Sequence, residues 1–181
     1  MERLTLIQLS PDWRLALLDM AKDYQAAGED RCQSVLQMND EAFYAYLRSL
    51  EDESKENYLP ADIAPQTTFW LTRDDDALLG YVSIRHKLTP ALEEEGGNIG
   101  YSIRPSERGK GYGKQLLTLA LKKAADLGLE SVLVTCEEDN QPSISAIEGN
   151  GGELIDTLTS KKSGNILRHY RIPTPTQSDS V

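Results

Sequence analysis

The chain contains little cysteine and little histidine, with two of each among its 181 residues. Cys32 and Cys136 could pair in principle, but Cys136 lies in an apolar run typical of a strand, where a buried free thiol is the ordinary finding. Neither cysteine has a second ligand at the spacing of a zinc site. We therefore expect neither a disulfide nor a metal centre.

Long apolar runs are missing as well. No stretch approaches the roughly 18 uninterrupted apolar residues of a membrane-spanning helix. Residues 1–9 alternate between polar and apolar positions, unlike a signal segment with its basic start and apolar block. We therefore expect a soluble, cytoplasmic protein with no membrane partner.

Positive charge is scarce, with 19 lysines and arginines against 29 aspartates and glutamates and a net charge of −10. This balance excludes a generally basic nucleic-acid binder. At 39% hydrophobic residues the chain can build a core, so a disordered protein is excluded too. The length predicts a single domain over residues 1–172, followed by a disordered tail over 173–181 that has no apolar pattern.

The few basic residues are concentrated in one segment. Residues 100–125 contain six basic residues and one acid, for a local charge of +5, whereas the remaining 155 residues sum to −15. Four of these cations fall within eleven residues around three glycines, which is a usual way to hold a polyanionic ligand. They are Arg104, Arg108, Lys110 and Lys114.

Hydrophobic periodicity predicts a mixed α/β fold. A strand, a long amphipathic helix and a buried strand over residues 98–136 indicate a parallel βαβ unit. Two runs around an acidic turn at 73–76 indicate an antiparallel hairpin, and a second hairpin closes the chain. The predicted strands are 4–9, 67–72, 78–88, 98–104, 131–136, 153–159 and 165–172; the predicted helices are 11–25, 39–50, 112–127 and 141–148, with polar connections over 51–65 and 89–97.

The segment 104–114, Arg-Pro-Ser-Glu-Arg-Gly-Lys-Gly-Tyr-Gly-Lys, lies between a predicted strand and the long helix. Its glycines allow a tight turn and a close approach to a ligand, so that backbone N–H groups and the positive helix end converge on a phosphate. A dinucleotide fingerprint would need glycine where Lys114 stands, and a Walker loop would need glycine where Arg108 stands. Neither of these motifs fits.

The pattern Arg108-x-x-Gly111-x-Gly113 resembles the acyl-CoA motif Gln/Arg-x-x-Gly-x-Gly/Ala of the GCN5-related N-acetyltransferase (GNAT) family. It has that family's position between the fourth strand and the third helix, and the order of elements agrees along most of residues 1–172. Asn140, which opens the next helix, agrees as well. The resemblance implies a central, mostly antiparallel sheet with a parallel βαβ unit at the acyl-CoA site, a closing C-terminal hairpin, and a splay between the fourth and fifth strands.

The resemblance also implies acetyl-CoA as co-substrate. The backbone of Tyr101, Ser102 and Ile103 would face the pantetheine and thioester, and Asn140 would lie at the pantetheine arm. The pyrophosphate would be held by the glycine-rich turn, which comprises Arg108, Gly109, Lys110, Gly111, Tyr112, Gly113 and Lys114.

The implied reaction is direct attack of an amine on the thioester. An alkyl amine has an ordinary pKa near ~10.4, so something must remove its proton first. Many family members carry a tyrosine acid seven residues after the asparagine, and some carry a glutamate base five residues before it. Those positions hold Ile147 and Thr135 here, and neither residue can do proton chemistry.

The general acid and the general base must therefore come from other positions, and the sequence offers three candidates. His86 lies at the end of the third strand, next to the acidic loop, and has the best-suited pKa, although an exposed strand-end histidine is as good an explanation. Glu137 follows the fifth strand, where an ordinary surface carboxylate is the alternative. Tyr101 could donate or relay a proton, although an aromatic residue in a central strand usually belongs to the core. His169, in the last strand, receives no role.

Acidic clusters at 74–76, 93–95 and 137–139 suggest a cationic acceptor such as a polyamine, an amino sugar or a lysine-rich segment, although surface solubility explains them equally well. The sequence therefore predicts an acetyl-CoA-dependent N-acetyltransferase acting on a primary amine of a small molecule or peptide. The alternative is a catalytically weak acyl-CoA-binding module. We expect a monomer, or a homodimer formed by pairing of closing-hairpin edges.

Overall fold

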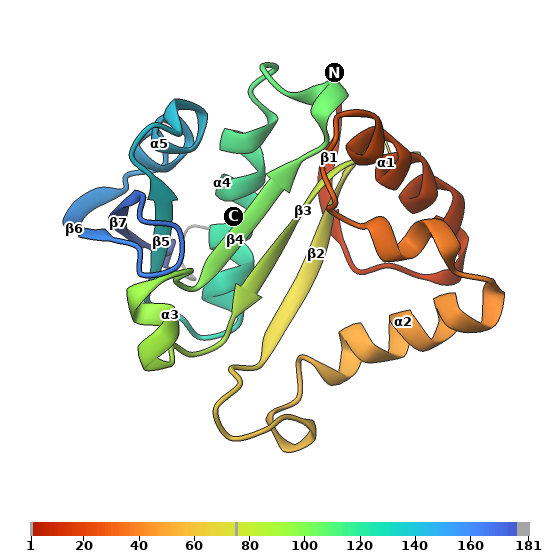
Figure 1. The fold of residues 1–181 in the computed structure, drawn as a ribbon, viewed down its shortest axis with the longest axis horizontal. Coiled ribbons are helices and arrows are strands. Elements are labelled where there is room, and N and C mark those ends of the chain that lie inside the picture. Colours follow the sequence, from red (N-terminus) through yellow and green to blue (C-terminus); the bar gives the residue numbers. More distant parts are fainter. Residues whose placement is uncertain (1, 75, 177–181) are drawn as a thin grey trace.

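The computed structural model describes residues 2–74 and 76–176, which form two antiparallel sheets (Figure 1). In the first sheet the strand order is β1-β2-β3-β4, and in the second it is β5-β7-β6. The strands are β1 Leu4–Ile7, β2 Gln66–Arg73, β3 Ala77–Arg85, β4 Ile99–Ile103, β5 Ser131–Glu137, β6 Glu153–Thr159 and β7 Ile166–Pro173.

Helices cover both faces of the first sheet. The α-helices are α1 Arg14–Ala26, α2 Asp40–Asp52, α3 Pro90–Glu94, α4 Tyr112–Asp126 and α5 Gln141–Glu148, and short 3₁₀ turns span 11–13, 33–37, 56–58 and 105–107. One core cluster joins α4 and α5 to the sheets, and a second joins α1 and α2 to Trp70 and Leu78 on the opposite face. Burial of these two apolar surfaces drives the layered arrangement.

The predicted elements are largely present, with differences at their ends. Asn39 caps α2 as expected, since its side chain accepts a hydrogen bond from the Ala42 N–H at 2.8 Å. The third strand stops at Arg85, three residues before the predicted end. The connection predicted over 89–97 contains the short helix α3, capped by Thr89, because five residues are too few to show a helical period.

β4 and β5 do not pair along their length, so the expected parallel βαβ unit has an open seam. The two sheets meet at Asn98, whose N–H donates to the Leu133 carbonyl at 2.7 Å, while the Leu133 N–H donates to the Asn98 side-chain oxygen at 2.8 Å. The Asn98 amide nitrogen also donates to the Arg85 carbonyl at 3.2 Å. One buried asparagine therefore forms the apex from which the sheets diverge.

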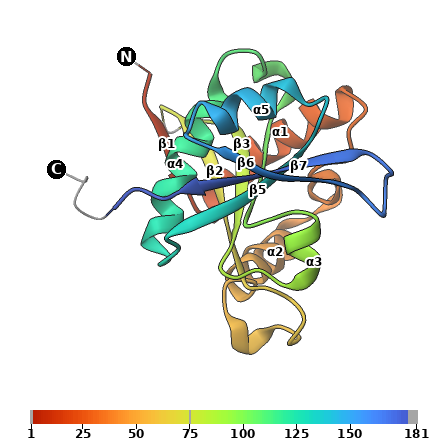
Figure 2. The same ribbon diagram turned by 90° about the vertical axis from the view of Figure 1, so that its left-hand side faces the viewer.

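The closing hairpin is present, and Figure 2 shows its strands with α5 above and α3 below them. The predicted tail begins inside β7, because Pro173 is still paired with Ser131. Thr174 is also fixed, since its hydroxyl donates to the Leu129 carbonyl at 2.6 Å. The start of the tail is therefore ordered, which corrects that prediction; residues 177–181 lie outside the described part of the chain.

Candidate active site: a cleft between the sheets

A cleft of about 680 Å³ lies between β4, the glycine-rich turn and the N-terminal part of α5. It contains all of the predicted acetyl-CoA-binding residues except Lys110. The segment after α1 supplies a further wall that the sequence did not indicate. The lining residues are Glu29, Arg31, Tyr101, Ser102, Ile103, Glu107, Arg108, Gly109, Gly111, Tyr112, Gly113, Lys114, Asn140, Pro142, Ser143, Ser145 and Ala146.

The glycine-rich turn presents a row of free backbone donors to this cleft. Gly109 and Gly111 have φ values of 77° and 86°, a left-handed conformation that glycine adopts without steric cost. Gly111 is also the N-cap of α4. Within residues 2–74 and 76–176, no backbone N–H from Gly109 to Lys114 donates a hydrogen bond. Successive unpaired N–H groups at a helix N-terminus form a binding site for an anion.

The cations of this segment are less available than the sequence suggests, because acids from α1 neutralise the first of them. Arg104 donates to Asp23 at 2.9 Å and forms an ion pair with Asp19 at 2.9 Å. Burial alone would raise the pKa of Asp23, but its hydrogen bonds from Arg104 and Ser106 outweigh this effect and leave the pKa lowered. Arg104 therefore anchors α1 to the turn and does not reach the cleft as a free charge.

Arg108, the first residue of the acyl-CoA motif, is paired as well. Its guanidinium donates to both carboxylate oxygens of Glu29, at 2.6 and 3.0 Å, and its Nε–H donates to the Ile103 carbonyl at 2.9 Å. It also lies 6.0 Å from the centre of the Tyr24 ring. The hydrogen bond from Arg108 lowers the pKa of Glu29. Arg108 thus fastens the segment after α1 across the cleft mouth.

The two lysines of the turn differ from each other. Lys110 forms an ion pair with Glu107 at 2.8 Å and is not among the residues that line the cleft. Lys114 lines the cleft and lies against Gly149 at the end of α5, where an added Cβ would sit 3.1 Å from its Nζ. Of the four cations that the sequence singles out, Lys114 is the one for which the structure gives no acidic partner among the described residues.

The inner part of the cleft is lined by β4 and the first turn of α5. The Tyr101 hydroxyl lies 3.1 Å from the Ser143 hydroxyl, and burial raises the pKa of Tyr101. Asn140 caps α5, since its side chain accepts a hydrogen bond from the Ser143 N–H at 3.2 Å. Tyr24 donates to the Ser102 hydroxyl at 2.8 Å from the opposite face.

The other two acid–base candidates lie outside this cleft. His86 is hydrogen-bonded through Nε2 to the Thr67 hydroxyl at 2.8 Å, and burial lowers its pKa. Glu137 is exposed and accepts a hydrogen bond from the Asn165 side chain at 3.0 Å. Neither residue lines the cleft, so the structure does not bring the three candidates together. β3 runs antiparallel to β4, so its end, next to His86, lies beside Asn98, whereas the cleft is lined by residues 101–103 at the other end of β4.

The two residues at the family's acid and base positions have structural roles. Ile147 is fully buried in the core. Thr135 accepts a hydrogen bond from the Gly96 N–H at 3.2 Å and lies beside His169 in the β5–β7 register. His169 is 5% exposed, and its Nε2 has no partner in the described part of the chain. Sequence reasoning set His169 aside, because only the register of β7 reveals its neighbour.

The acidic clusters are partly neutralised too. Glu94 and Glu95 form ion pairs with Lys161 and Lys162 in the turn before β7, at 2.8 and 3.8 Å. Glu138 pairs with Arg168 at 3.6 Å. The cluster at 74–76 includes a residue outside the described part. Less unpaired negative charge is therefore available for a cationic acceptor than the sequence implies.

Comparisons with known proteins agree with this geometry. The model of the acetyltransferase (GNAT) family matches residues 32–151. RimL, a ribosomal-protein alpha-N-acetyltransferase solved with coenzyme A, has a TM-score of 0.66 at 18% identity, covering 94% of this chain and 93% of that one. The microcin C7 self-immunity acetyltransferase MccE, solved with acetyl-CoA and AMP, has a TM-score of 0.66 at 14% identity, covering 94% and 92%.

A spermidine N-acetyltransferase chimera built partly from Vibrio cholerae SpeG has a TM-score of 0.63 at 17% identity, covering 94% of this chain and 95% of that one. A search of curated proteins gave no match. Identities this low show the fold alone, and the three proteins are named for different acceptors or roles. The family match extends over well over half of the chain and includes the glycine-rich turn. The chain belongs to the acetyltransferase (GNAT) family.

Proposed function

We propose that this chain is an acetyl-CoA-dependent N-acetyltransferase that transfers the acetyl group to a primary amine of a small molecule or peptide. The observation that carries the proposal is the row of unpaired N–H groups from Gly109 to Lys114 at the mouth of the cleft. These donors suit a pyrophosphate, and the cleft continues from them along β4. Neighbours with this fold were crystallised with acetyl-CoA or coenzyme A.

Transfer requires that the amine nitrogen attack the thioester carbonyl carbon, after which the carbon–sulfur bond breaks. We assign Tyr101 as the acid that protonates the leaving thiolate. Its hydroxyl lies in the cleft beside Ser143, and its raised pKa keeps it protonated at neutral pH. The attacking nitrogen gives its second proton to water as the amide forms, and water returns a proton to Tyr101 after each turnover.

No described side chain in the cleft is placed as a base for the amine. Glu29 is paired with Arg108, Glu107 is paired with Lys110, and His86 lies outside. We therefore propose that the amine loses its proton to water before it attacks.

A second candidate function is an acyl-CoA-binding module with little transferase activity. Thr135 and Ile147 favour it, because both are committed to structural contacts at positions where proton transfer would be expected. The module would bind acetyl-CoA and release coenzyme A slowly, at a rate that amines do not change.

The first test is isothermal titration of acetyl-CoA into wild type, Gly111→Asp and Gly128→Asp. The two glycines have nearly equal φ values of 86° and 85°, and an added Cβ meets nothing within 4 Å at either. Both variants therefore carry the same backbone strain, but only Gly111→Asp places a carboxylate at the anion site. We expect Gly111→Asp to lose at least about 10-fold in affinity, as for one lost charged hydrogen bond, and Gly128→Asp to bind as wild type.

Wild type that is folded and does not bind would refute the cofactor site. Binding followed by amine-dependent release of coenzyme A, monitored as free thiol, would establish transfer. Release that no amine accelerates would favour the binding module.

A further inference from the structure

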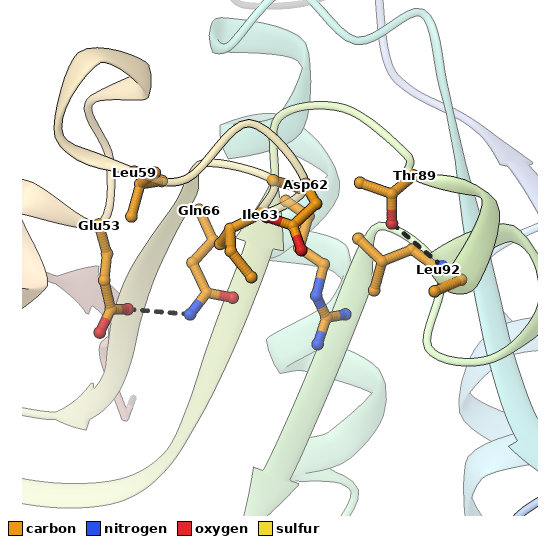
Figure 3. Close-up of a pocket in the computed structure, with 10 residues that line it drawn as sticks. Glu53, Leu59, Asp62, Ile63, Gln66, Thr89 and Leu92 are labelled. Carbon is orange, nitrogen blue, oxygen red and sulfur yellow. Dashed lines mark hydrogen bonds between the residues drawn. The ribbon is translucent and has the colours of Figure 1, made fainter.

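A second cavity, of about 440 Å³, lies between the segment that follows α2 and the N-terminal end of α3 (Figure 3). It is separate from the cleft at the glycine-rich turn and shares no lining residue with it. Most of its wall is apolar, with a few polar groups that converge on it. The lining residues are Glu53, Leu59, Asp62, Ile63, Ala64, Gln66, Arg85, Thr89, Ala91 and Leu92.

Arg85 is the one cation in the lining of this cavity. Its Nη1 donates to the Gly96 and Gly97 carbonyls at 3.2 and 3.0 Å. Among residues 2–74 and 76–176 no carboxylate lies within ion-pair distance of its guanidinium, and its Nη2 and Nε have no hydrogen-bond partner. Two carboxylates also line the cavity. Glu53 accepts a hydrogen bond from the Gln66 side chain at 2.9 Å, and neither Glu53 nor Asp62 forms an ion pair with Arg85.

A half-buried guanidinium without a counter-ion is costly unless a ligand supplies the missing charge. Burial lowers the pKa of Arg85, in keeping with this lack of an acidic partner. Arg85 presents its remaining donors as a planar fork, which matches a carboxylate in geometry. The cavity is therefore suited to a ligand with an anionic head and an apolar body.

The guanidinium also lies beside the strand along which the proposed thioester would sit. A Cβ added to Gly100 would be 3.8 Å from the Arg85 Nη1 and 3.9 Å from its Nη2. Gly100 is the residue of β4 immediately before Tyr101, which lines the cofactor cleft. Successive side chains of a strand point to opposite faces, so Arg85 lies against β4 on the face opposite the Tyr101 side chain, one residue from the lining of the cofactor cleft.

We propose that this cavity is the acceptor site and that the acceptor is an α-amino carboxylate, a free amino acid or a compound with the same amine and carboxylate on neighbouring carbons. The inference rests on the proposed transferase function and names its substrate class. Arg85 binds the carboxylate, and the neighbouring amine is thereby held close to β4. Leu59, Ile63 and Leu92 contact the side chain of the acceptor.

Arg85 also affects deprotonation of the acceptor amine, beside the carboxylates of Glu53 and Asp62 that line the same cavity. In a free amino acid the carboxylate stabilises the neighbouring ammonium and so disfavours loss of its proton. Pairing the carboxylate with Arg85 cancels that stabilisation, and the amine becomes neutral more readily. Arg85 would then be a binding residue that assists deprotonation without taking the proton itself.

The test compares amino acids with their carboxamides, which keep the amine and side chain and lack the negative charge. We would measure kcat/KM with saturating acetyl-CoA for L-leucine and L-methionine and for their amides, in wild type, Arg85→Met and Arg85→Lys. Arg48→Met is the matched control, because Arg48 is exposed and lines a different cavity on α2.

Wild type and Arg48→Met are expected to prefer the acids. Arg85→Met is expected to lose about 10- to 100-fold on the acids, as for one charged hydrogen-bonded pair, and little on the amides. Arg85→Lys should keep part of the preference. A purely structural role of Arg85, holding Gly96 and Gly97, would reduce acids and amides equally and would leave their ratio unchanged.

Titration with acetyl-CoA separates this proposal from the one on which it rests. Wild type that binds acetyl-CoA but accepts amides, peptides or polyamines as well as free amino acids would overturn the acceptor class and leave the transferase standing. Wild type that does not bind acetyl-CoA would remove both. Should Arg85→Met fail to fold, the acid-to-amide ratio of wild type alone still decides, because a ratio near one refutes the proposal.

Discussion

Replacing Asn98 by alanine should weaken the whole molecule, because this side chain joins the two sheets at their apex. Asn98 is 4% exposed, and its amide accepts from the Leu133 N–H and donates to the Arg85 carbonyl. Its own backbone N–H keeps its bond to Leu133 in the variant. The substitution therefore removes two side-chain hydrogen bonds and leaves one buried N–H and one carbonyl without partners.

The expected cost follows from those groups. A hydrogen bond contributes a net of about 1 kcal/mol, and a buried donor left without a partner costs about 1–3 kcal/mol. Asn98→Ala should therefore lower the free energy of unfolding by about 2–4 kcal/mol. For a chain of this size each kcal/mol shifts the Tm by about 2–4 °C.

Urea and thermal unfolding of Asn98→Ala would be compared with wild type and with Asn165→Ala. Asn165 also makes an amide hydrogen bond, to Glu137, but an exposed one, so its loss should cost less than about 0.5 kcal/mol. Acetyl-CoA affinity should fall in Asn98→Ala as well, because the separation of β4 and β5 is set at this apex. A loss no larger than that of Asn165→Ala would show that the apex is held by the backbone alone.

Gly111→Ala should lower the free energy of unfolding by about 1–2 kcal/mol, because a side chain is strained at a φ of 86°. Gly113→Ala should leave the free energy of unfolding unchanged, because its Cβ would make an ordinary contact with the Tyr101 ring at 3.9 Å. Urea unfolding of both variants tests these expectations. Glu29→Gln should cost less than about 1 kcal/mol at pH 7, since the pair with Arg108 is partly exposed. Folding lowers the pKa of Glu29. The stabilisation that Glu29 provides is therefore fully present above its ordinary pKa of ~4.3 and disappears as the pH falls through the lowered pKa. A difference in free energy of unfolding between wild type and Glu29→Gln that persists below the lowered pKa would contradict a stabilising ion pair with Arg108. The Cys136 thiol, whose pKa burial raises to about 11, should be alkylated by iodoacetamide about 300-fold more slowly at pH 7.5 than an ordinary thiol, and at the ordinary rate after denaturation.

The sequence predicted the elements that periodicity and capping residues define. The helix after Asn39, the helix over 112–127 and the closing hairpin all lie within a few residues of their predicted bounds. These elements are set by local patterns of apolar residues, so a single sequence carries enough information to place them. The sequence did not predict helix α3, because its five residues are too few to show apolar residues recurring at helical spacing.

The structure places the predicted turn beside a cleft and pairs most of its cations with acids, while binding of acetyl-CoA by these residues stays a prediction. The glycines of the turn specify their own conformation, and the turn does open onto a cleft. The partners of Arg104 and Arg108 lie about eighty positions away on or after α1, and no local pattern links them. Arg85 was passed over for the same reason, since its lack of a counter-ion exists only in three dimensions.

The ion pairs that neutralise the cations of the glycine-rich turn determine how its binding of an anion responds to ionic strength. Salt weakens binding mainly in proportion to the unpaired cations that a ligand engages, and backbone N–H donors carry no net charge to screen. With Arg104, Arg108 and Lys110 already matched by acids, Lys114 remains as the exposed contributor among the described residues. An anion bound at this turn should therefore hold its affinity over a wide range of salt. An acidic protein can in this way select a diphosphate by the shape of its backbone. It needs no basic surface, which would also bind other polyanions non-specifically.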